Sequence, residues 1–259
     1  MPQRFLTVPL LLTIAIALAC ALAATVPAGE TANPEVSFKP ADMEKWTLLT
    51  PGPGMAAWRK PTGEWAMAGE AASDPANEKA LAVKPGTGII YNGPKGQTAN
   101  ILTEMEHGDC ALHVEFMIPK KSNSGVYLMG RYEIQVYDSY GVEKDAYPGI
   151  ECGGIYPRWD GKEFEGHSPR VNASRKPGEW QTFDIIFQAP RFDAAGKKTA
   201  NARFVKVIHN GQLIHENIEV TGPTRAATFN DEKPAGPLMF QGDHGPVAYR
   251  NVRVMAMGK

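Results

Sequence analysis

The sequence predicts an all-β protein, and three observations support this fold class. Beyond residue 38 there is no sustained helical periodicity, whereas many short segments alternate apolar and polar residues between turn signals. The chain contains 26 glycines and 21 prolines, which suits a protein dominated by turns and loops. The dipeptide Asn210-Gly211 stands between two apolar segments and indicates a two-residue hairpin, because both central positions of a type I′ turn need a positive φ.

The first 23 residues have the pattern of a signal peptide. A lone Arg4 precedes an apolar stretch over residues 5–24, in which Ala21 and Ala23 provide the small residues of a cleavage site. We therefore expect an exported protein, periplasmic or extracellular, without a membrane span once residues 1–23 are removed. Two alternatives stay open: the residues around Cys20 resemble a bacterial lipobox, which would make the protein a lipoprotein, and the uncleaved apolar stretch is nearly long enough to span a bilayer.

After the leader we expect a linker over residues 24–37 and one domain over residues 38–259. The linker lacks a hydrophobic pattern, and β-sandwiches commonly reach 200–250 residues as single units. The net charge is −1 and no long run of Lys or Arg occurs, so the sequence gives no basic stripe for nucleic acid. An oxidising compartment would permit Cys110 and Cys152 to pair, but the sequence leaves their pairing open.

Seven segments of the domain have the clearest strand character. They are residues 112–118, 126–137, 182–188, 203–209, 212–220, 237–241 and 247–254. The long stretch over residues 139–179 is different, because it places many aromatic residues, Tyr156 among them, between glycines and prolines without clean alternation. Its composition predicts a packed, functional loop.

The segment 131–138 carries the candidate chemistry. Side chains of a strand alternate between faces, so Arg131, Glu133 and Gln135 share one face while the apolar residues between them pack the core. Neighbours in this polar row lie roughly 6–7 Å apart, a spacing suited to successive hydroxyls of a sugar. Asp138 has the opposite parity and joins the row only through a bulge or at the strand end. The alternative is a solvated face with an Arg131–Glu133 ion pair of little energetic value.

A second polar segment, residues 241–245, forms a turn between two expected strands. It contains Gln241 and the pair Asp243-His244, in which the carboxylate could orient the imidazole ring and tune it for general acid–base work. Arg250 follows this turn and could contribute to the site or act as a structural partner for a carboxylate.

The residues Glu133-Ile-Gln-Val-Tyr-Asp138 resemble the Glu-x-Asp-x-x-Glu strand of laminarinase-type glycoside hydrolases. Gln135 replaces the middle carboxylate and Asp138 is shorter than Glu, so displacement by two carboxyl groups is not assured. The difference favours another chemistry on a similar scaffold.

Several ordered blocks resemble the 3-keto-disaccharide hydrolase family over about residues 38–255. The resemblance implies a concanavalin A-like jelly-roll β-sandwich that cleaves the glycosidic bond of sugars already oxidised at carbon 3. The blocks are residues 123–141, 177–187, 209–211, 222–224, 236–245 and 249–252.

A ketone at carbon 3 acidifies the hydrogen on carbon 2, so the implied reaction needs one base, a stabiliser for the enolate oxygen and a proton donor. We expect Glu133 or Asp138 as the base and His244 as the proton donor, with Arg131 or a bound divalent cation at the enolate oxygen. No dedicated ligand motif for such a cation is present. We expect the carbohydrate to be bound by Asn123, Tyr127, Arg131, Gln135, Tyr156, Gln241 and Arg250. A non-catalytic carbohydrate-binding module on the same fold is the alternative.

Overall fold

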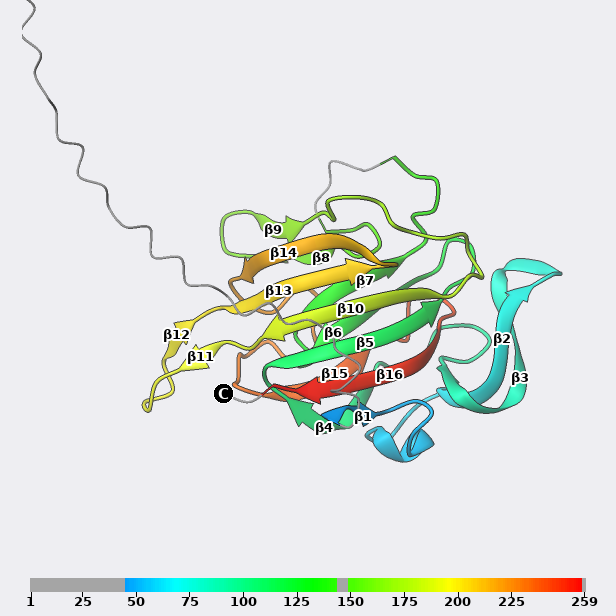
Figure 1. Ribbon diagram of the computed structural model, residues 1–259, viewed down its shortest axis with the longest axis horizontal. Helices are drawn as coiled ribbons and strands as arrows, with labels where there is room; N and C mark the ends of the chain where they lie inside the picture. Colours follow the sequence, from blue (N-terminus) through cyan, green and yellow to red (C-terminus); the bar gives the residue numbers. More distant parts are fainter. Residues whose placement is uncertain (1–44, 144–148, 258–259) are drawn as a thin grey trace, which may run out of the picture. The chain divides into compact units, whose positions relative to one another are not determined.

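The computed structural model describes residues 45–143 and 149–257, which form a β-sandwich of two antiparallel sheets (Figure 1). The signal peptide over residues 1–23, Cys20 within it and the linker over residues 24–37 lie outside the described residues. The one helix among the named elements is the short 3-10 helix η2 (Gly54–Ala57). Within the described ranges, no helix has the length and apolar character needed to cross a membrane.

The larger sheet contains most of the strands predicted from the second half of the sequence. In sheet order it consists of β14 (Gln212–Val220), β13 (Ala202–His209), β10 (Gln181–Gln188), β5 (Cys110–Met117), β16 (Ala248–Ala256), β3 (Asn77–Tyr91) and β2 (Ala66–Asp74), with β1 (Thr47–Leu48) paired to β16. A separate two-stranded ribbon is formed by β11 (Arg191–Phe192) and β12 (Lys198–Ala200).

The smaller sheet has six strands and carries the polar row of the sequence. In order it consists of β4 (Ile101–His107), β15 (Gly236–Phe240), β6 (Asn123–Leu128), β7 (Tyr132–Tyr137), β8 (Ile155–Trp159) and β9 (Phe164–His167). Strands β6 and β7 lie at its centre, so their outward side chains are flanked by neighbouring strands on both sides.

The two sheets pack against each other around one hydrophobic core, as expected for a jelly-roll sandwich. A stack of aromatic rings joins them: Phe240 of β15 lies parallel to Tyr249 of β16, with ring centroids 4.0 Å apart, and Trp58 packs on Phe240 at 5.3 Å. All three side chains are fully buried. The all-β, concanavalin A-like jelly-roll sandwich predicted from the sequence is thereby confirmed.

The strands confirm one local prediction and differ from two others. The Asn210-Gly211 hairpin is confirmed, with φ values of 49° and 79° at its two central residues. The single strand expected over residues 126–137 is wrong, because Met129 and Gly130 adopt positive φ and divide it into the hairpin β6–β7. The stretch over residues 139–179, expected as a loop, contains β8 and β9.

Cys110 and Cys152, whose pairing the sequence left open, are both free and buried. Burial raises the pKa of the Cys152 thiol to about 12. These side chains therefore act as small apolar core groups.

We predict that Phe240→Ala lowers the free energy of unfolding by about 3–5 kcal/mol, because it removes the ring that joins the two sheets and leaves a cavity. Urea denaturation measures the change. The matched control is Phe164→Ala on β9, whose ring is half exposed and should cost under about 1 kcal/mol. Equal effects of the two substitutions would contradict the role given to the ring stack.

Candidate functional site

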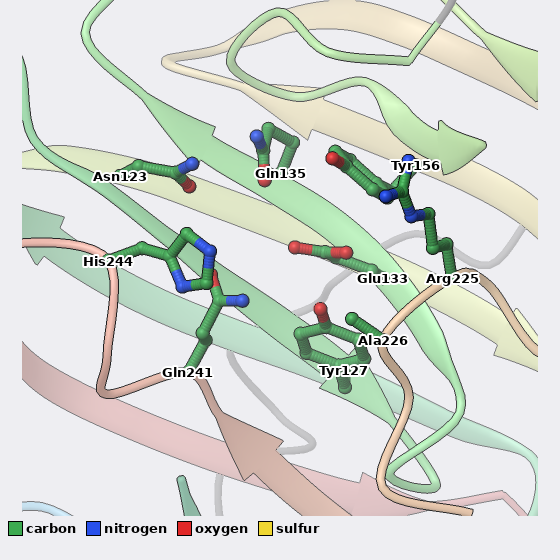
Figure 2. A pocket seen from close by; sticks show the side chains of 9 residues that line it. All are labelled: Asn123, Tyr127, Glu133, Gln135, Tyr156, Arg225, Ala226, Gln241 and His244. Carbon is green, nitrogen blue, oxygen red and sulfur yellow. The ribbon is translucent and has the colours of Figure 1, made fainter. Parts of the chain in front are cut away.

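A polar pocket opens on the face of the smaller sheet that points away from the core. Its volume is about 190 Å³, below the roughly 300–1,000 Å³ of pockets that enclose drug-sized ligands. Its walls come from β6, β7, β8, the turn after β15 and the segment that precedes β15 (Figure 2). The lining residues are Asn123, Tyr127, Glu133, Gln135, Tyr156, Arg225, Ala226, Gln241 and His244.

Glu133 occupies the middle of this pocket and is 1% exposed. It lies directly across from Tyr127 in the β6–β7 ladder, while the next outward position of β6 is Gly125. A Cβ atom on Gly125 would collide with the Glu133 carboxyl group, so the glycine provides the space that this group fills. With its amide nitrogen toward the acceptors, Gln135 donates to Glu133 Oε1 at 3.0 Å and to the Ser124 carbonyl at 3.1 Å.

Burial raises the pKa of Glu133 to about 8, since the charged form is desolvated. A hydrogen bond from the Tyr127 hydroxyl acts in the opposite direction, whereas the negative charge of Asp243 raises the pKa further. Burial and the neighbouring carboxyl group also raise the pKa of Tyr127 well above its usual range, so its hydroxyl keeps its proton and donates. The site thus holds a carboxyl group that changes protonation near neutral pH.

His244 lies on a turn that one buried amide fixes in place. Its Nδ1 is 2.5 Å from Asp243 Oδ1, which leaves Nε2 for a ligand. Asn92 is fully buried and donates to the carbonyls of Gly242 and Gly245 at 3.0 and 2.8 Å, while its own carbonyl accepts from Val247 N at 2.8 Å. Asn92 therefore positions the turn without lining the pocket.

Arg225 is the guanidinium group of the pocket and was not among the site residues predicted from the sequence. Thr224 fixes this segment to β7, because its backbone N donates to the Arg131 carbonyl at 2.8 Å and its hydroxyl accepts from Glu133 N at 3.2 Å. The next residue, Ala226, has a φ of 62°, a conformation that side chains with a Cβ rarely adopt. The signal available in the sequence was the block at residues 222–224, which Arg225 directly follows.

Arg131 is not a member of the pocket, which corrects the prediction that it continues the polar row of Glu133 and Gln135 in the binding site. It lies in the β6–β7 turn, and its guanidinium donates to the Asp231 carbonyl and carboxylate at 2.5 and 2.8 Å and to the Met129 carbonyl at 2.8 Å. It also lies over the Phe229 ring at 4.7 Å. Arg131 therefore anchors the segment that carries Arg225, and the alternative of an Arg131–Glu133 ion pair is excluded.

Asp138 and Arg250 also lie outside the pocket. Asp138 follows the end of β7, where its carboxylate accepts from Lys121 N at 2.8 Å and closes a turn. Arg250 belongs to β16 of the larger sheet, donates to Glu115 at 2.6 Å and stacks over Trp180 at 4.0 Å. Both are structural partners in the described protein. The other seven predicted site residues line one pocket: Asn123, Tyr127, Glu133, Gln135, Tyr156, Gln241 and His244.

Two buried oxygen atoms in the pocket walls lack a partner among the described residues. They are Asn123 Oδ1 and Gln241 Oε1, and the Gln241 side chain is 7% exposed. Buried polar atoms are nearly always hydrogen-bonded to protein or to water, so these two acceptors are open to the donors of a bound molecule. Sugar hydroxyls are donors of this kind.

The pocket places three different chemical groups in order. Figure 2 shows the Glu133 carboxyl group between Arg225 on one side and His244 on the other. A base, a cation and a proton donor can therefore reach neighbouring atoms of one bound molecule. Among the described residues, no cluster of three or more His, Cys, Asp or Glu side chains is placed to hold a metal ion.

Comparisons with known proteins give a family for the chain and relatives of the same fold. A family model described as the 3-keto-alpha-glucoside-1,2-lyase-like domain matches residues 45–255. A candidate glycosyl hydrolase from Parabacteroides distasonis ATCC 8503 is 27% identical with a TM-score of 0.59, over 82% of this chain and 84% of that one. A second from the same organism, 18% identical with a TM-score of 0.54 over 82% and 99% of the two chains, supports the fold alone. A comparison with curated proteins finds no match.

We predict that Glu133 makes stability depend on pH. Its pKa is higher in the folded protein (about 8) than the ordinary value of 4.5, so between these values the folded state binds more protons than the unfolded chain. The free energy of unfolding therefore falls as pH rises through this window, by about 1.4 kcal/mol for each unit of pKa difference. Urea denaturation at several pH values measures this fall.

Glu133→Gln should flatten the dependence, because the amide does not titrate. The exposed Glu163→Gln serves as the control and should leave it unchanged. An unaltered pH dependence in Glu133→Gln would show that the raised pKa is wrong.

Proposed function

Because the chain belongs to the 3-keto-alpha-glucoside-1,2-lyase-like domain family, we propose that it cleaves the glycosidic bond of 3-keto-glycosides by elimination followed by water addition. The family and the fold support a carbohydrate-active enzyme that cleaves glycosides. The 3-keto substrate and the order of steps are our proposal. They rest above all on the buried carboxyl group of Glu133 between Arg225 and His244.

The order of these three groups matches the order of the reacting atoms. Carbon 2 of a 3-keto-glycoside carries the acidic hydrogen and lies between the ketone carbon and the anomeric carbon. Figure 2 shows Glu133 between Arg225 and His244, so a substrate with carbon 2 at Glu133 can place its ketone oxygen toward Arg225 and its leaving oxygen toward His244. The unpartnered acceptors Asn123 and Gln241 then lie on the leaving-group side, where they can accept from hydroxyls.

In the first half of the reaction, the Glu133 carboxylate removes the proton from carbon 2. The electron pair of that C–H bond forms an enolate, and Arg225 stabilises the negative oxygen at carbon 3. The enolate then expels the group on carbon 1, whose oxygen takes a proton from Nε2 of His244 as the C–O bond breaks. The products of this half are the free alcohol and an unsaturated ketone with a double bond between carbons 1 and 2.

Water addition reverses these proton transfers. His244 takes a proton from a water molecule as its oxygen bonds to carbon 1, and Glu133 returns its proton to carbon 2. The net result is hydrolysis, and both side chains recover their starting protonation states. Asp243 holds the His244 ring through Nδ1 during both halves.

A carbohydrate-binding module is the second candidate function. Its support is the pair of unpartnered acceptors, Asn123 and Gln241, which would serve binding without turnover equally well. A binding module needs no titratable group with a shifted pKa, however, and Glu133 has one. This observation favours the enzyme.

We predict that Glu133→Gln lowers the rate of aglycone release from a 3-keto-glucoside by about 10²–10⁴-fold while sugar binding is kept. Release of the alcohol and absorbance of the unsaturated ketone are followed together. Asp138→Asn is the matched control, because its carboxyl group lies outside the pocket, and it should retain turnover. Full activity in Glu133→Gln, or sugar binding without turnover in the wild type, would favour the binding module.

We also predict that kcat/KM rises with pH on an acid limb, because Glu133, whose pKa is about 8, must be ionised, and falls at alkaline pH, because His244 must carry a proton on Nε2 while Asp243 holds Nδ1. On the acid limb the increase should be about tenfold for each pH unit. A pH–rate profile with a 3-keto-glucoside measures it. Tyr127→Phe should move the limb that Glu133 sets to higher pH, because the hydrogen bond from the Tyr127 hydroxyl favours the ionised carboxylate and its loss raises the pKa of Glu133. A profile that is flat from acid to neutral pH would exclude Glu133 as the base.

A further inference from the structure

The row of outward side chains on β7 continues beyond the pocket to an exposed aromatic ring. Glu133 and Gln135 line the pocket, whereas the alternate residues of this strand are fully buried in the core. Tyr137 lies two residues after Gln135, on the same side of the strand as the pocket residues, and its side chain is 41% exposed. Its side chain therefore lies on the pocket face of the sheet, one position beyond Gln135.

The strand pairing places this ring against the pocket wall. Tyr137 is directly opposite Asn123 in the β6–β7 ladder, and Gln135 is opposite Gly125. Side chains at directly opposed positions have Cβ atoms about 4.5–5.5 Å apart. The ring is thus a neighbour of both Asn123 and Gln135, and Asn123 carries one of the unpartnered acceptors.

The dimensions of the pocket require part of a larger substrate to lie outside it. The pocket volume is about 190 Å³, and Tyr137 lies four residues along the strand from Glu133, roughly 13 Å. A ring bound over Glu133 leaves a second ring on the side of His244 and Asn123, which is the leaving-group side of the proposed reaction. An exposed tyrosine offers a flat apolar face with a polar tip, which suits the C–H face of a sugar and its hydroxyl rim.

We propose that Tyr137 is the binding platform for the leaving group and that the protein is selective for glycosides whose leaving group is a ring. The orientation of the substrate rests on the proposed function. The ring platform itself rests on the exposed position of Tyr137 beside Asn123 and Gln135.

The test compares two ligands in a background that cannot turn them over. Methyl 3-keto-α-glucoside and the corresponding glucosyl 3-keto-α-glucoside are titrated calorimetrically into Glu133→Gln and into Glu133→Gln with Tyr137→Ala. Loss of the ring should weaken the glucosyl ligand about five- to tenfold and leave the methyl ligand within about twofold. Tyr137→Phe should retain the affinity for both, because it keeps the ring.

Controls and kinetics separate this inference from the proposed function. Phe164→Ala removes a similarly exposed ring from the outer strand β9 and should change neither ligand. In the active enzyme, Tyr137→Ala should raise KM for the glucosyl substrate with little change in kcat. An equal effect on both ligands, or none, overturns the role of Tyr137. Ring-selective loss of binding in a protein without turnover would keep the platform and refute the proposed function.

Discussion

The site depends on one constraint: the carboxyl group of Glu133 is buried and forms no ion pair with a cation among the described residues. The space exists because Gly125 has no side chain, and the polar contacts there come from the neutral Tyr127 hydroxyl and the Gln135 amide. Neutral donors satisfy the hydrogen bonds of the carboxyl group but compensate only in part for the desolvation of its charge. A pKa near neutrality follows from this arrangement, and a general base needs such a pKa.

The two arginines near this carboxyl group have separate tasks, and the separation keeps the pKa of Glu133 high. An arginine in direct contact would favour the ionised form and lower that pKa. Arg131 is instead engaged with Asp231 and the Met129 carbonyl, where it fixes the segment that precedes β15. The same segment brings Arg225 to the pocket, so a cation is available for charge that develops on a ligand.

Strand alternation predicted the all-β class and the shared face of Glu133 and Gln135, whereas the jelly-roll sandwich was implied by the family resemblance and His244 came from the polar turn at residues 241–245. Glu133 and Gln135 share a face with period two, and the Asn210-Gly211 turn requires its hairpin. The errors arise where the chain turns. Positive φ at Met129 and Gly130 moved Arg131 off the strand, and nothing in the local pattern around Arg225 indicates that Thr224 will fasten its segment to β7. The apolar–polar periodicity of a sequence does not predict long-range contacts of this kind.

The geometry also distinguishes two ways of cleaving a glycosidic bond. Displacement by paired carboxyl groups needs two of them about 5–9.5 Å apart, with one acting as acid and the other ionised. Asp138 closes a turn and Asp243 is engaged by His244, so Glu133 is the one carboxyl group among the described residues that line the pocket. A substrate acidified by its own ketone needs a single base. Glu133 has the Arg225 cation on one side and the His244 proton donor on the other. This arrangement fits a reaction in which negative charge develops on the ketone oxygen of the substrate, rather than one in which positive charge develops on the sugar ring.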